Sequence, residues 1–314
     1  MSNVGYTFLL SLVIILLGYL SKRIGIVEEQ DSGPLTRVIL NITLPALIIR
    51  TVSGITLDAS YLFLPLFCIG YSALVMLAAA FLFRRKPLDV RGLLVVSAVG
   101  YNIGLFAYPL VEALYGQVAL FYLATFDIGS AITNFGLSFV VAALMAPGRG
   151  NGGSSGTVSI RSMVALPAKS VPLLSYFVAI AINISGLQIP LFLDDFLLVL
   201  ASGNQVLVLL MLGILLRFAP EHAMWKDIGQ VMAIRYGTGL LVGIALFALL
   251  PFGTLYRSVL LISLVLPVSM IVVPYAVRFG YRRELAGTLV NATIVASYFI
   301  MWLVVIVLER VVSA

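Results

Sequence analysis

Two ionisable residues interrupt long apolar stretches of this sequence. Asp127 lies in FYLATFDIGSAITNF and Arg235 lies in VMAIRYGTGLLVGIALF. Inside a membrane such a residue costs roughly 2.5 to 3.5 kcal/mol, so its side chain should face the protein interior or water. Asp127 could accept a proton or ligate a cation and so couple ion movement to a conformational change. Alternatively, the two residues could form a structural ion pair. The two interpretations are compatible, because such pairs can exchange during gating, so both residues are candidate coupling residues.

A second unusual stretch, residues 100–116, reads GYNIGLFAYPLVEALYG and combines polar residues with a proline. Proline inside a helix removes an amide donor and clashes with the preceding turn, at a cost of about 3 kcal/mol or more. In hydrocarbon, broken backbone survives only where it is buried in protein or lines a wet cavity. The amino-terminal end of such a break presents amides that suit an anion, and carbonyls at the other end can coordinate a cation. One interpretation is therefore a binding site near Asn102 and Pro109, and the other is a proline kink without a ligand.

The elements that carry these residues must lie in a membrane. Of the 314 residues, 61% are apolar and 10% are charged, and the mean hydropathy is +1.13. A soluble domain has no means of absorbing repeated apolar runs of about 20 residues with so little charge to coat its surface. The single cysteine, Cys68, lies in an apolar run, and the single histidine, His222, lies in a loop. We therefore expect no disulfide and no metal site.

Windows of about 20 residues predict ten membrane-spanning helices. We place them at residues 5–21, 34–51, 60–83, 90–114, 118–145, 171–188, 196–218, 228–250, 255–279 and 285–308. The predicted fold class is an all-α integral membrane protein.

The basic residues indicate the orientation. Fifteen of the 19 Lys and Arg residues fall in the connections that follow odd-numbered spans, within residues 22–37, 84–91, 149–169, 217–226 and 278–283. By the positive-inside rule these connections are cytoplasmic, and both termini lie on the other side of the cytoplasmic membrane. The net charge of +6 therefore reports topology, with some attraction to anionic lipid, and requires no nucleic-acid partner.

The longest connection, residues 146–170, contains PGRGNGGSSG and is predicted to be a flexible cytoplasmic linker. It separates a first five-helix repeat at residues 1–145 from a second at residues 171–314. Two halves with an odd number of spans are inverted relative to each other, as in many secondary transporters. The prolines support the repeat, since Pro109 in the fourth span has counterparts in Pro267 and Pro274 of the ninth.

Three segments resemble a known family, namely LTRVILNITLPALII in the second span, residues 100–116 with the VALFYL that follows, and LPVSMIVVPYAVRFGY in the ninth. They are similar to segments of the auxin efflux carrier family, which includes plant PIN-type auxin carriers and bacterial permeases for malonate, malate and related acids. The resemblance covers essentially the whole chain. It implies a fold similar to the bile acid sodium symporters and NhaA, with two inverted five-helix repeats whose fourth and ninth helices are broken and cross at the substrate site. It also implies a moving transport domain of spans 3, 4, 5, 8, 9 and 10, and a scaffold of spans 1, 2, 6 and 7 that often dimerises.

The resemblance assigns roles to individual residues. Pro109 and Pro267 match the crossover prolines, and Asn102 matches an asparagine that helps to hold a substrate carboxylate. Further substrate-binding candidates are Tyr101, Gly104, Ser269, Asn41 and Gln205. For the last three, hydrogen bonding between helices is the alternative interpretation, because small polar groups also join membrane helices. Glu112, three residues after Pro109, is interpreted as an interfacial or vestibule residue.

We therefore expect a secondary active carrier that moves small organic anions, auxin-like carboxylates or dicarboxylates, by elevator-type alternating access. No cofactor is expected. Coupling to H⁺ fits Asp127, whereas coupling to Na⁺ fits less well because the ninth span has no acidic residue at its break. A sodium-coupled symporter of the bile acid type and a channel-like pore are the alternatives. An enzyme is not expected, since one histidine in a loop and one aspartate well inside the bilayer do not make a hydrolytic site. The expected partners are the anion, membrane lipid and a second copy of the chain bound through spans 1, 2, 6 and 7.

Overall fold

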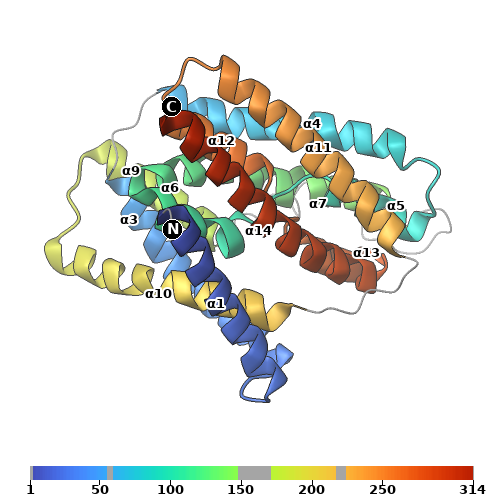
Figure 1. Cartoon of the computed structure of the whole chain (residues 1–314), viewed down its shortest axis with the longest axis horizontal. Helices are drawn as coiled ribbons and strands as arrows, with labels where there is room; N and C mark the ends of the chain where they lie inside the picture. The colour runs from blue at the N-terminus through green and yellow to red at the C-terminus, as the bar shows by residue number, and fades with distance from the viewer. Residues whose placement is uncertain (1–2, 55–58, 148–170, 217–223, 314) are drawn as a thin grey trace.

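The computed structural model describes residues 3–54, 59–147, 171–216 and 224–313. These residues form helices joined by short turns, and within them the extended pairing is an isolated bridge between Tyr101 and Val268 (Figure 1). Most of the predicted linker at residues 146–170 lies outside the described residues, and so does His222. The all-helical prediction is confirmed for the part of the chain that the structure covers.

The α-helices follow one another along the chain as labelled in Figure 1. They are α1 (Asn3–Arg23), α2 (Ser32–Val38), α3 (Leu44–Ser53), α4 (Phe63–Leu82), α5 (Leu88–Ser97), α6 (Tyr108–Ile132), α7 (Ser138–Leu144), α9 (Val171–Ser185), α10 (Leu191–Leu215), α11 (Trp225–Leu249), α12 (Thr254–Leu264), α13 (Val272–Phe279) and α14 (Arg283–Ser313).

Seven helical stretches of the described residues are long and apolar enough to cross a membrane, and two shorter apolar helices accompany them. Six of the seven coincide with predicted spans 1, 2, 3, 7, 8 and 10. The seventh, Ile103–Leu144, has 42 residues, and a straight helix of that length would be about 63 Å long, twice the hydrocarbon thickness of about 30 Å. Gly116 divides it, because its φ of 72° and ψ of −164° turn the chain, a conformation that glycine adopts without strain.

The fourth and ninth predicted spans are each interrupted near their middle. Helix α5 ends at Ser97 and helical structure resumes at Ile103, while α12 ends at Leu264 and α13 begins at Val272. The two interruptions lie against each other, since the Asn102 amide donates to the Pro267 carbonyl over 3.0 Å beside the Tyr101–Val268 bridge. Backbone groups that lose their helical partners therefore find partners in the other break, as burial in an apolar medium requires.

The break in the fourth span precedes Pro109 and does not coincide with it. Pro109 lies in the first turn of α6, directly after a π-helical turn at Ile103–Ala107. A similar π-helical turn at Ile39–Thr43 directly precedes the first turn of α3, which contains Pro45. Widening of the helix before a proline relieves the clash of its ring with the preceding turn, so these prolines bend helices that continue through them.

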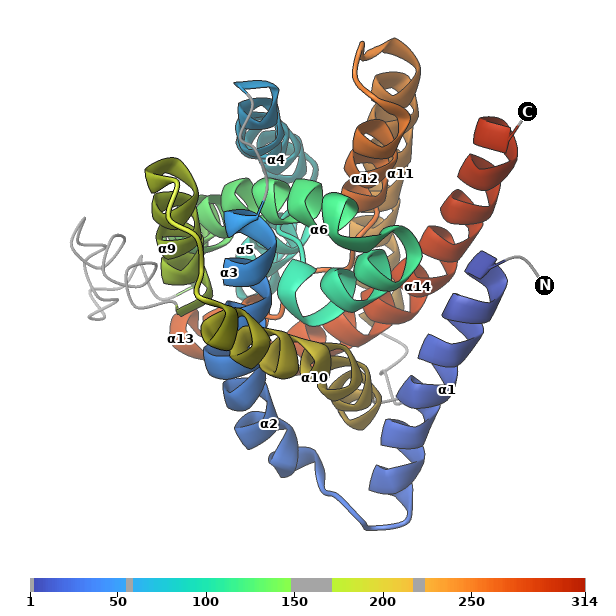
Figure 2. The same cartoon turned by 90° about the vertical axis from the view of Figure 1, so that its left-hand side faces the viewer.

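The helices pack in two groups. Helices α1, α2, α3, α9 and α10 contact one another, and α4, α5, α11, α12, α13 and α14 form the second group. Figure 2 shows α3 and α9 on the left, α2 and α10 below and α1 at the lower right, with α4, α11 and α12 above them. Helix α6 contacts both groups. The two groups also meet directly, because Phe8 of α1 packs its ring against Tyr298 of α14 at 5.4 Å between centroids.

Candidate functional site

A cavity of about 460 Å³ lies where the paired breaks face the first group of helices. One wall consists of Tyr101 to Leu105, which include the end of the first break and the start of the π-helical turn. Another wall consists of Ser269 to Ile271, just before α13. The opposite wall comes from α2, the turn before α3, and the start of α9, and contributes Thr36, Leu40, Asn41, Leu44, Val171, Pro172 and Tyr176. The cavity thus lies between the breaks and the first helix group.

The helix ends at the cavity are amino-terminal. Ile103, Gly104 and Leu105 begin a helical segment, and Met270 and Ile271 lead into α13. The first amides of a helix have no intrahelical partner and carry the positive end of its dipole, equivalent to roughly half an elementary charge. Two such ends facing one cavity form a site suited to an anion.

Asn102 adds a side-chain donor at the same place. The residue is 5% exposed and lines the cavity, and its Nδ2 is buried without a hydrogen-bond partner within the described structure. A buried amide without a partner costs roughly 1 to 3 kcal/mol, so such a group in a binding cavity points to a ligand that completes its hydrogen bonds.

Asp127 is held by two tyrosines. The hydroxyls of Tyr108 and Tyr176 donate to Oδ2 of Asp127 at 3.1 and 2.9 Å, and the two hydroxyls also contact each other. Tyr108 comes from the first turn of α6 and Tyr176 from α9, so the cluster joins α6 to the first helix group. Asp127 lines the cavity beside these donors, where its carboxyl can take up or release a proton in reach of a bound ligand.

Arg235 of α11 is 2% exposed and lies on the other side of the breaks. Its Nε donates to the Leu266 carbonyl at 2.7 Å, and its terminal nitrogens donate to the carbonyls of Pro267 at 2.9 Å, Gly100 at 2.8 Å and Ser97 at 3.4 Å. Its guanidinium carbon also lies 4.7 Å from the centre of the Tyr101 ring. The Asp127–Arg235 pair that the sequence left open is therefore not formed, because tyrosine hydroxyls hold one residue and backbone carbonyls hold the other.

The structure gathers most, but not all, of the predicted site residues. Asp127, Tyr101, Asn102, Gly104, Ser269 and Asn41 line the cavity, whereas Pro109, Pro267, Gln205 and Arg235 lie outside its lining. Next to Gln205, the fully buried Asn204 accepts a hydrogen bond from Thr43 at 2.8 Å. That contact joins α10 to the turn before α3. It is a hydrogen bond between helices, the alternative to substrate binding for the polar residues of these spans.

Tyr108 and Tyr176 were not among the sequence-based candidates. Tyr108 immediately precedes Pro109, but nothing in the order of residues indicates that it faces an aspartate 19 positions later. Tyr176 lies in an apolar run of the sixth span, where a tyrosine carries no distinguishing signal. It also borders a second, more apolar cavity of about 470 Å³ with Val52, Tyr61, Phe121 and Ile180. Tyr176 thus separates a polar cavity from an apolar one.

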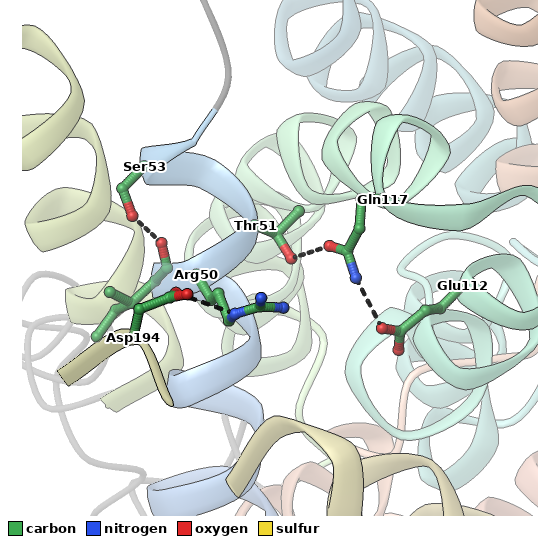
Figure 3. Close-up of polar contacts among 7 residues, drawn as sticks. Arg50, Thr51, Ser53, Glu112, Gln117 and Asp194 are labelled. Atoms are coloured by element: carbon green, nitrogen blue, oxygen red, sulfur yellow. Dashed lines mark hydrogen bonds and ion pairs between the residues drawn. The ribbon is translucent and has the colours of Figure 1, made fainter. Parts of the chain in front are cut away.

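Glu112 belongs to a polar chain at the other end of α3 (Figure 3). Thr51 donates to Oε1 of Gln117 at 3.1 Å, and Nε2 of Gln117 donates to Glu112 at 3.0 Å. On the neighbouring turn Arg50 forms an ion pair with Asp194 of α10 at 3.0 Å. Figure 3 shows the Arg50 guanidinium between Asp194 and Glu112. Glu112 and Gln117 flank the turn at Gly116, so the chain ties this turn of α6 to α3.

A sequence profile of the family described as membrane transport protein matches residues 7–305. The chain belongs to this family. The resemblance to auxin efflux carriers is thereby confirmed, because this is the family that contains them.

Two members of the membrane transport protein family come from methanogenic archaea. One, from Methanothermobacter thermautotrophicus, is 25% identical over 93% of this chain and 94% of its own length. The other, from Methanocaldococcus jannaschii, is 24% identical over 93% of this chain and 95% of its own length. Both are described as uncharacterized transporters. The cavity at the paired breaks therefore belongs to a membrane transporter.

Proposed function

We propose that the protein is a secondary carrier of small organic anions and that the substrate carboxylate binds at the paired breaks. The observation that carries the proposal is the cavity lined by two amino-terminal helix ends and by Asn102, whose buried Nδ2 has no partner in the described structure. Hydrogen bonds to a charged acceptor are worth about 1.5 to 3 kcal/mol each, so a few converging amides can replace the hydration of one carboxylate. Transport, and not catalysis, is the activity proposed.

The lining of the cavity supports a substrate with one carboxylate and an apolar body. Its volume of about 460 Å³ suits a small molecule, and none of the lining residues of this cavity is a lysine or arginine. Leu40, Leu44, Ile103, Phe135 and Met270 supply apolar surface opposite the amides. A second carboxylate would lie near Asp127 without a cation to neutralise it, so dicarboxylates fit this site less well than monocarboxylates.

Coupling to protons follows from the position of Asp127 in the same cavity. An ionised Asp127 repels a substrate carboxylate across a site of low dielectric constant, whereas a protonated Asp127 does not. Proton and anion then bind together and cross together. The sodium-coupled alternative has less support, because the break before α13 offers the cavity Ser269, Met270 and Ile271 and no acidic side chain.

For the architecture we propose ten spans in two inverted repeats, with broken helices that cross at the site. The paired interruptions of the fourth and ninth spans support this arrangement. The first helix group corresponds to the scaffold, through which two copies associate, and the second to a transport domain that moves past it. Thr36 and Val171 border the cavity next to predicted cytoplasmic connections, and the Thr51–Gln117–Glu112 chain lies at the opposite end. These positions support an inward-open state, with both termini on the non-cytoplasmic side.

The test is uptake by proteoliposomes that contain the purified protein, with a panel of labelled mono- and dicarboxylates and imposed pH or sodium gradients. We expect saturable uptake of a monocarboxylate, acceleration by a proton gradient of the same direction, and counterflow of labelled substrate. Equal rates with and without the protein would contradict the proposal. Flux that neither saturates nor shows counterflow would instead indicate a channel.

A further inference from the structure

The surroundings of Arg235 are those of a bound cation. Its four hydrogen-bond acceptors are all backbone carbonyls, and they come from two separate chain segments. Ser97 and Gly100 belong to the end of α5 and the break that follows it, while Leu266 and Pro267 follow the end of α12. Each of these helix ends carries the negative end of a helix dipole, equivalent to roughly half an elementary charge. Together they amount to about one negative charge, which the guanidinium balances.

Close packing of α11 against α12 brings the guanidinium to these carbonyls. Gly239 follows Arg235 by one helical turn and lies on the same face of α11. A Cβ on Gly239 would lie 2.3 Å from the Leu264 carbonyl oxygen, so a larger residue here would push the end of α12 away. Gly237, which points elsewhere on the helix, has open space around the corresponding position. The close approach of α11 and α12 thus depends on the lack of a side chain at Gly239, on the face of α11 that carries Arg235.

We propose that the paired breaks form a cation site built from main-chain carbonyls and that the guanidinium of Arg235 is its permanent, covalently tethered occupant. The planar guanidinium bonds to both breaks at once and fixes their amide ends at the substrate cavity. Arg235 is therefore a positioning residue, which acts on the substrate through the two breaks. No free metal ion is needed to hold this side of the site together. The inference deepens the proposed function. The binding of both breaks by Arg235 does not depend on that function, whereas the expected independence of transport from sodium rests on it.

Removal of the guanidinium tests the proposal by rescue with a free cation. Arg235→Ala should lower the unfolding temperature of the purified protein, and millimolar methylguanidinium should restore much of the loss in a saturable manner, because a ligand that binds only the folded state stabilises it. Urea, which has a similar planar shape without the charge, should not restore it at the same concentration. Sodium and potassium should restore less, because the four carbonyls accept from three separate nitrogens of a planar group and a single spherical ion does not match that spacing.

Arg257→Ala is the matched control. Arg257 is a half-buried arginine in the first turn of α12 that also donates to a main-chain carbonyl, that of Phe247, at 2.7 Å. It binds outside the paired breaks, so methylguanidinium should not restore stability to this variant. Equal rescue of both variants, or equal rescue of Arg235→Ala by urea, would overturn the proposal.

A second variant covers the case in which Arg235→Ala does not fold. In Arg235→Lys the ammonium keeps the charge but cannot span both breaks in the plane of a guanidinium. We expect this protein to unfold at a clearly lower temperature than the wild type and to bind substrate with a raised KM. A lysine variant as stable as the wild type, with an unchanged KM, would refute the tethered guanidinium. Transport by the wild type should not change when sodium is replaced by choline, and that measurement is separate from the rescue of stability.

Discussion

The backbone amide of Asn102 and the carbonyl of Pro267 form a hydrogen bond of 3.0 Å between the two interrupted spans. This bond divides the region of the breaks into two sides. On one side, amino-terminal helix ends face the cavity, and on the other, carbonyls face Arg235. One arrangement of main chain thus provides donors for an anion and acceptors for a cation.

Asn102→Ala should reduce the affinity for the substrate carboxylate by about 10- to 100-fold, since one hydrogen bond to a charged group contributes about 1.5 to 3 kcal/mol. The measurement is KM for uptake in proteoliposomes, with expression and unfolding temperature unchanged. Asn183→Ala is the control, because Asn183 donates to the carbonyls of Val52 and Ser53 outside this cavity. Near-normal KM for Asn102→Ala would remove Asn102 from the binding site.

Asp127→Asn should abolish the acceleration of uptake by a proton gradient and leave exchange of labelled for unlabelled substrate intact. The amide cannot release a proton, so it resembles the protonated carboxyl at every pH. Uptake with and without an imposed pH gradient measures the effect. Asp195→Asn, on the exposed side of α10, should retain the wild-type response. An Asp127→Asn protein that still responds to the gradient would place proton coupling elsewhere.

Gln117→Ala should loosen the carboxyl-terminal end of α3, because it removes the residue that joins Thr51 to Glu112. We expect a larger fraction of molecules to open on the non-cytoplasmic side. With Cys68 replaced by serine, a cysteine introduced at the buried Val52 reports this opening through its rate of labelling by a membrane-impermeant thiol reagent. Gln188→Ala, which alters a glutamine outside the chain of contacts, is the control. If the introduced cysteine is labelled at the same rate in Gln117→Ala as in the Gln188→Ala control, the hydrogen bonds from Thr51 to Gln117 and on to Glu112 do not restrain opening.

Gly239→Ala should destabilise the protein by roughly 1 to 3 kcal/mol, the usual cost of forcing an extra group into a packed interior. The reason is the 2.3 Å separation between the added Cβ and the Leu264 carbonyl oxygen. Thermal unfolding in detergent measures the change. Gly237→Ala introduces the same methyl group two residues away, where no atom lies within 4 Å, and should be neutral or slightly stabilising. Destabilisation of both variants to the same extent would contradict a specific role for the contact with α12, because alanine has the higher helix propensity and should not destabilise α11 by itself.

Hydropathy predicted the helical class and the position of most spans, because it reports which segments can be buried in lipid. The prolines located the break of the ninth span, since Pro267 lies between α12 and α13, but not that of the fourth. Pro109 indicated an interrupted fourth span, but the chain leaves helical geometry before Asn102 and has resumed it at Pro109. Where a helix is interrupted depends on which backbone groups find partners in another segment, and Pro267 is remote in sequence from Asn102. A single sequence contains no direct record of that pairing.

The same limit applies to the charged residues. The apolar surroundings of Asp127 and Arg235 predicted that both face the protein interior or water, and the opposite charges suggested a pair. The structure gives Asp127 two tyrosine hydroxyls and gives Arg235 four main-chain carbonyls. Carbonyls are present at every residue, so the sequence does not show which of them will be free to accept a hydrogen bond. Tyr176 was missed for a related reason, since its partners Asp127 and Tyr108 lie on a helix of the first half.

The groups that distinguish the two sides of the breaks are mostly main-chain atoms, and this affects how the protein can change in evolution. A substitution alters a side chain but leaves the amide and carbonyl of its residue in place, proline excepted. The capacity to hold one negative group can therefore persist while the cavity wall around it is replaced residue by residue. Selection for a different substrate would act on positions such as Leu40, Leu44 and Phe135, which line the cavity without forming the breaks. Relatives with about a quarter of their residues in common could then share the site and differ in what they carry.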